Sequence, residues 1–148
     1  MASDEAPGWR EISFSKSHPK MTARWHTLDP VALYWAPKFV QSLWGAKEIH
    51  ITENGCATED EPAADGKFYD TDRIMFLRAY LTQLRRATAE GVPVKGYFQW
   101  STMDNFEWNA GLSWNRFGLV YVDFTTQKRT PKISASFFRE CSKRNAVA

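Results

Sequence analysis

Glu53 follows an apolar segment at a place where α/β proteins put their reacting groups. The β-branched run Ile49–Thr52 predicts a short buried strand, which stops at Asn54-Gly55. Glu53 therefore stands at the carboxyl end of that strand, where α/β barrels and open α/β sheets carry their chemistry. Burying a carboxylate there is costly unless it is used or neutralised. Glu53 is a candidate reacting group, and a solvated glutamate at a strand end is the alternative.

A second carboxylate, Glu107, stands in an aromatic setting. Val94–Trp100 predicts another apolar strand, and it runs directly into the segment S-T-M-D-N-F-E-W at residues 101–108. The tryptophans of this stretch by themselves are consistent with core packing. A carboxylate between two aromatic rings is a poor choice for a core, so Glu107 favours a binding role.

Together, I-T-E-N-G (residues 51–55) and W-S-x-x-D-N-F-E-W (residues 100–108) resemble the last two barrel strands of the family 1 glycoside hydrolases, the retaining β-glucosidases and their relatives. The resemblance runs from about Trp9 to Arg139. It implies an α/β fold of the (β/α)₈ TIM-barrel type, a β-glucoside or related sugar as substrate, and no cofactor.

The length of the chain limits how much of a barrel it can contain. A (β/α)₈ barrel needs roughly 250 residues and at least about 200, whereas this chain has 148. We therefore expect only the C-terminal part of the barrel, its seventh and eighth β/α units, in residues 9–148. Residues 1–8 are small and polar and are predicted to be disordered.

The resemblance implies that Glu53 is the nucleophile of a retaining glycosidase, which needs a second carboxyl group about 5–5.5 Å away. In the family that acid/base glutamate lies in a T-x-N-E-P motif, which this sequence lacks. Asp60-Glu61-Pro62 looks similar but follows no predicted strand. General acid catalysis is worth about 10²–10⁴-fold, so the chain alone should be nearly inert on ordinary glucosides.

The resemblance also implies a sugar-binding set. Glu107 and Trp108 match the residues that grip the sugar, the carboxylate at the C4 and C6 hydroxyls and the indole N–H at the C3 hydroxyl. Trp100 matches the floor of that subsite, and Phe117 an aromatic residue near the C6 hydroxyl. Trp25 matches a tryptophan that stacks on the leaving-group sugar. Glucose is not distinguished from galactose or fucose.

Composition excludes some classes of partner. A net charge of +2 argues against nucleic-acid and membrane-surface binding, and no apolar run reaches the roughly 18 residues of a membrane span. Met1 is not followed by a secretory-signal pattern, and Cys56 and Cys141 lack metal-site spacing. We expect free thiols, a cytoplasmic location and no metal. His50 is predicted to be a packed strand histidine rather than a ligand.

The predicted elements alternate as in a parallel sheet. A first helix should start at Asp29-Pro30 and end at Gly45, with a kink or break at Pro37 and an apolar stripe of Ala32, Ala36, Phe39, Val40 and Leu43. A second should run from Asp70 to Gly91 and bury Ile74, Leu77, Leu81 and Leu84. The two strands, 48–53 and 94–100, should pair in parallel, each backed by a helix.

The C-terminal part should contain a short strand at residues 119–124 and a last helix capped by Thr130-Pro131. The apolar side of that helix should consist of Ile133, Phe137, Phe138 and Cys141. Residues 57–69 are rich in acids, alanine and proline and predict a surface loop.

Three functions remain open. The chain is an enzyme fragment that acts when a complementary barrel fragment is supplied, or a non-catalytic module that self-associates and binds sugar weakly, or a truncated product that folds only by oligomerising. Each of them requires a partner, because a two-stranded parallel piece leaves both of its edges open.

Overall fold

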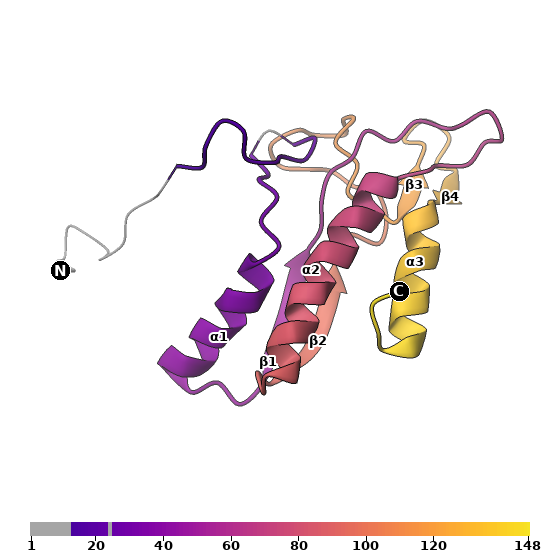
Figure 1. Ribbon diagram of the computed structural model, residues 1–148. Coiled ribbons are helices and arrows are strands. Elements are labelled where there is room, and N and C mark those ends of the chain that lie inside the picture. The colour runs from indigo at the N-terminus through magenta and orange to yellow at the C-terminus, as the bar shows by residue number, and fades with distance from the viewer. Residues whose placement is uncertain (1–12, 24) are drawn as a thin grey trace.

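The computed structural model describes residues 13–23 and 25–148 (Figure 1). The prediction of a disordered N-terminus at residues 1–8 lies outside these residues. In chain order the elements are α1 (Ala32–Trp44), β1 (Ile49–Asn54), α2 (Thr71–Ala89), β2 (Val94–Gln99), β3 (Val120–Val122), β4 (Arg129–Pro131) and α3 (Ile133–Arg144).

Strands β1 and β2 pair in parallel in a two-stranded sheet, as the sequence predicted. The connection between them contains α2, which lies along both strands in Figure 1. Helices and strands therefore alternate as in consecutive β/α units. The described residues form no closed barrel.

One hydrophobic cluster joins all three helices to the same face of the sheet. Its buried centre is on α2, where Phe76, Leu77, Tyr80 and Leu84 are at most 6% exposed. Side chains of α1, β1, β2 and α3 pack around this centre: Leu33, Ile51, Val94, Tyr97, Phe137 and Phe138. Of the four α2 residues predicted to be buried, Leu77 and Leu84 are buried, whereas Ile74 and Leu81 are half-buried at the margin.

Helix α1 departs from its prediction in two ways. It begins at Ala32 and continues unbroken through Pro37, whose ring is buried, so the predicted break is wrong. Its buried residues are Leu33, Tyr34 and Pro37, and the predicted stripe lies largely in solvent, with Phe39 54% exposed. The helix is apolar on two faces, and only one of them can meet α2. The hydrogen bond from Tyr34 Oη to Glu90 Oε2 (2.7 Å) fixes which face this is.

The C-terminal region contains a hairpin that the sequence analysis missed. Strand β3 confirms the short strand predicted at residues 119–124, and it pairs antiparallel with β4. Thr130 and Pro131 belong to β4 and do not cap α3, so that prediction is wrong. Proline is tolerated because this short strand needs no donor at its last residue.

The N-terminus of α3 is capped from a distant part of the chain. The backbone N–H and the hydroxyl of Ser134 both donate to the buried carboxylate of Asp70, which immediately precedes α2. Asp70 makes no capping bond to its own helix. One carboxylate thus holds the starts of α2 and α3 together.

Cys56 and Cys141 are free, buried thiols. None of the helices in residues 13–23 and 25–148 is both long and apolar enough to cross a membrane.

Candidate active site

A bulge in β1 turns Glu53 away from the helices. Ile51 lies opposite Tyr97, but Asn54 lies opposite Gln99, so Thr52 and Glu53 together oppose the single residue Phe98. Without this extra residue, strict alternation would place Glu53 on the same face as Ile51, which packs into the core. In the structure Glu53 is exposed, as is Phe98. Bulges next to active sites commonly re-aim a side chain in this way.

The ends of β1 and β2 are bound tightly to each other. The backbone N–H of Trp100 donates to Asn54 O (3.0 Å), and Tyr97 Oη donates to Asn54 Oδ1 (2.9 Å). A Cβ added to Gly55 would lie 1.7 Å from Trp100 O, so only glycine permits this approach. The motif around Glu53 therefore directly contacts the first residue of the second motif, and Trp100 is 37% exposed there.

Glu107 and Trp108 lie in the loop of residues 100–119 between β2 and β3. A tight turn presents them: Glu107 N donates to Gly111 O (3.0 Å), and Gly111 N donates back to Glu107 O (2.6 Å). Trp108 is 90% exposed, and its ring meets the ring of Phe106 edge-on. The turn thus holds a half-buried carboxylate beside a free indole, an arrangement suited to binding a polyhydroxylated ligand.

Trp25 and Phe117 differ in their exposure. Trp25 is about half exposed in the segment before α1, whereas Phe117 is 8% exposed and buried against Ala23 and Ala57. This cluster joins the Trp25 segment, the loop after β1 and the 100–119 loop. The predicted sugar contacts of Phe117 and Trp25 stay predictions, and in this chain Phe117 acts as a packing residue.

His50 is not packed, so that prediction is wrong. It lies on the sheet face that the described helices leave open, and it is exposed. Its Nε2 is 2.8 Å from Glu48 Oε1. Within residues 13–23 and 25–148, no group of histidine, cysteine or carboxylate side chains could hold a metal ion.

Sequence reasoning missed a group of buried charges beneath these loops. The side chains of Asp60, Arg73, Asp104 and Lys132 are at most 2% exposed. Lys132 Nζ donates to Asp104 Oδ1 (2.9 Å) and is also paired with Asp60. Asp104 was visible within the second motif, and Arg73 is spaced three residues after Asp70. Nothing local marked Lys132.

Burial acts on the pKa values of this region. It lowers the pKa of the Lys132 ammonium, as does nearby Arg73, while Asp60 and Asp104 oppose that effect. Burial likewise raises the pKa of Asp70, opposed by Arg73 and by the hydrogen bonds from Ser134. The neighbouring carboxylates and cations therefore stabilise one another's charged forms, which isolated buried charges could not do.

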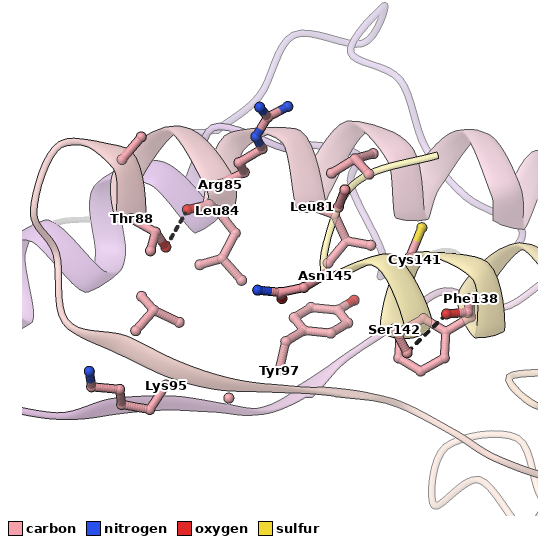
Figure 2. Close-up of a pocket in the computed structure, with 15 residues that line it drawn as sticks. Leu81, Leu84, Arg85, Thr88, Lys95, Tyr97, Phe138, Cys141, Ser142 and Asn145 are labelled. Atoms are coloured by element: carbon pink, nitrogen blue, oxygen red, sulfur yellow. Dashed lines mark hydrogen bonds between the residues drawn. The ribbon is translucent and has the colours of Figure 1, made fainter.

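A cavity of about 610 Å³ lies elsewhere, between α2, β2 and α3 (Figure 2). It is lined by the amino half of β2, including Lys95 and Tyr97, and by the C-terminal halves of the two helices. None of the predicted site residues lines it. In the (β/α)₈ barrels that the two sequence motifs resemble, the amino-terminal end of the strands serves stability rather than chemistry, so the candidate site stays at the carboxyl ends of β1 and β2.

Comparison with models of known protein families shows to which family the chain belongs. The model of glycosyl hydrolase family 1 matches residues 2–147 of the chain. The chain belongs to glycosyl hydrolase family 1. Its resemblance through the two carboxylate-bearing motifs is thereby confirmed.

Individual relatives agree with the family assignment. Beta-glucosidase A of Thermotoga maritima is 43% identical over 93% of this chain and 30% of its own length. Beta-glucosidase 1 of Oryza sativa is 39% identical over 82% of the chain and 23% of its own length. A solved structure of the family 1 β-glucosidase of Thermotoga maritima in complex with isofagomine lactam superposes with a TM-score of 0.85 at 43% identity, covering 89% of this chain and 30% of that protein. The chain thus spans between 23% and 30% of the length of these family 1 relatives.

Proposed function

We propose that this chain supplies the nucleophile and part of the sugar subsite of a retaining β-glucosidase, corresponding to the seventh and eighth β/α units of its barrel. The remaining units come from elsewhere, in the same polypeptide or in another one. The main support is the bulge in β1 that leaves Glu53 exposed, next to Asn54, whose carbonyl oxygen accepts a hydrogen bond from Trp100 N. The Thermotoga maritima relatives were solved with sugar-like ligands, including glucoimidazole and deoxynojirimycin.

In the proposed reaction, a Glu53 carboxylate oxygen attacks the anomeric carbon of a β-glucoside, and the glycosidic C–O bond breaks. The leaving oxygen takes a proton from a carboxylic acid that this chain does not contain. Water then attacks the glycosyl ester of Glu53 as the same group removes its proton, and the β-configuration is retained. Glu107 and Trp108 hold the sugar hydroxyls, and Trp100 lies beneath the ring.

The test is a chimaera in which this chain replaces the matched segment of the Thermotoga maritima enzyme. We expect it to cleave an aryl β-glucoside, and we expect Glu53→Gly to abolish turnover. Added azide should restore cleavage and give the α-glycosyl azide, because the anion enters from the face that the carboxylate vacates. Glu61→Gln is the matched control, since Glu61 is an exposed residue of the next loop. An active Glu53→Gly chimaera would refute the assignment.

The second candidate is a non-catalytic module that self-associates and binds sugar weakly. It is favoured by the apolar outer face of α1, where Trp35, Phe39, Leu43 and Trp44 are each about half exposed or more. A monomer rarely leaves such a surface in water. We expect light scattering of the isolated chain at micromolar concentration to report oligomers, and a compact monomer would contradict this. The cytoplasmic location stays a prediction.

A further inference from the structure

The buried charge cluster (Asp60, Arg73, Asp104 and Lys132) connects the two loops that carry the proposed site. Asp60 belongs to the loop that follows β1 and Glu53, whereas Asp104 belongs to the 100–119 loop. Lys132, just before α3, bridges the two carboxylates. Both carboxylates and the ammonium are at most 2% exposed, so solvent and salt screen the bridge far less than they would a surface ion pair.

Asp104, near the start of the 100–119 loop, also binds the segment in which that loop ends. Its carboxylate accepts hydrogen bonds from Gly118 N (2.9 Å) and Val122 N (3.2 Å). A Cβ on Gly118 would lie 2.1 Å from Asp104 N, so the two ends of the loop are in direct contact. Glu107 and Trp108 follow Asp104 by three and four residues. Their backbone therefore starts from a point that Asp104 holds.

Arg73 adds a second connection from α2. Its guanidinium donates to Asp70 Oδ2 (2.7 Å) and to Gly118 O (3.1 Å), and it lies 3.4 Å from Asp60. The loops themselves pair through Thr58 N to Arg116 O (3.0 Å) and Arg116 N to Thr58 O (3.1 Å). Several independent contacts therefore hold these loops together, and each member of the cluster contacts residues from at least two segments of the chain.

Stability alone does not account for such a cluster, because well-packed apolar residues can often replace a buried ion pair without loss. What a charged bridge adds is a fixed relative position. We propose that Asp104 and Lys132 are positioning residues: they set where the loop bearing Glu107 and Trp108 lies relative to the end of β1 bearing Glu53. Neither of them touches the substrate. The inference rests on the proposed function, since the positioned groups act there.

The test compares two substrates in the chimaera, an aryl β-glucoside and its 6-deoxy analogue. Glu107 is assigned to the C6 hydroxyl, so the parent should prefer the glucoside. In Lys132→Met and Asp104→Asn, we expect that preference, measured as a ratio of kcat/KM values, to fall by about tenfold or more, because small misplacements of binding groups are costly. A ratio does not depend on how much enzyme is folded.

Two further variants separate positioning from stability. Leu84→Ala removes a buried side chain of α2 from the main hydrophobic cluster, so it should lower the Tm and leave the ratio unchanged. The double variant Asp104→Asn/Lys132→Met removes one charge of each sign, so its Tm should be higher than that of the single variants. Its preference for the glucoside over the 6-deoxy analogue should stay as low as theirs. An unchanged ratio in both single variants, or a ratio that recovers with the Tm, overturns the inference.

Hydrogen exchange of the 148-residue chain gives a readout that does not require activity. In Lys132→Met, the amides of Gly118 and Val122 should exchange faster, whereas in Leu84→Ala they should keep their protection relative to global unfolding. If the parent chimaera is inactive and these amides still respond to Lys132→Met, the proposed function fails and the role of Lys132 in holding the loop stands. Unchanged exchange at both amides overturns that role.

Discussion

Gly55→Ala should separate the ends of β1 and β2. The added Cβ would lie 1.7 Å from Trp100 O and 2.8 Å from the carbonyl carbon of the same residue. Both are backbone atoms, so no side-chain rotation relieves the overlap. An ordinary contact begins near 3.4 Å, and the two strand ends must therefore move apart by more than an ångström.

The cost follows from the contacts that such a movement breaks. The hydrogen bonds from Trp100 N and Tyr97 Oη to Asn54 contribute about 1 kcal/mol each. Forcing an extra methyl group into a packed site adds about 1–3 kcal/mol. We therefore expect a loss of roughly 3–5 kcal/mol, a large part of a typical total of about 5–15 kcal/mol. Since Glu53 lies two residues earlier, kcat/KM in the chimaera should fall about 10²-fold.

Gly66→Ala is the matched control. Gly66 has a φ of +76° and open space around it, so alanine there should cost only the left-handed backbone conformation, about 1–2 kcal/mol. Urea unfolding gives the stability difference, and kcat/KM per folded molecule gives the effect on the site. If Gly55→Ala and Gly66→Ala change the free energy of unfolding and kcat/KM by the same amounts, the contact between Gly55 and Trp100 does not constrain the site.

Two further predictions concern the scaffold. Hydrogen bonds from Lys38 and Tyr34 lower the pKa of Glu90 to about 2, so its contribution to stability is present above its ordinary pKa of 4.5 and is lost as the pH falls towards 2. Glu90→Gln should therefore lower the Tm at about pH 6 and make no difference near pH 2, and a gap that is constant across this range would contradict the linkage. The side chain of Phe76 is 1% exposed and stacks on Tyr80. Phe76→Ala should therefore lower the free energy of unfolding, measured with urea, by about 3–5 kcal/mol. The control Met75→Ala, at an exposed neighbouring position, should change the free energy of unfolding by no more than about 0.5 kcal/mol. Similar losses for the two variants would disprove the assignment of Phe76 to the hydrophobic core.

The sequence by itself determined the local elements and the family. Apolar runs and breakers located both strands and α2, because side-chain alternation and helix-stop residues act within a few positions of the chain. The two motifs around Glu53 and Glu107 are continuous in sequence, and this is why they could be recognised without a structure.

Only the tertiary structure decided which surfaces and charges are buried. Three features depend on what packs against each element: the exposure of His50, the choice of the buried face of α1, and the bulge at Glu53. The local sequence pattern does not encode these packing partners. Asp60 looked like one more acid of a solvated loop, yet it pairs with Lys132, 72 residues later. An ion pair between residues so far apart forms only when the fold brings them together, and its partner cannot be read from either neighbourhood.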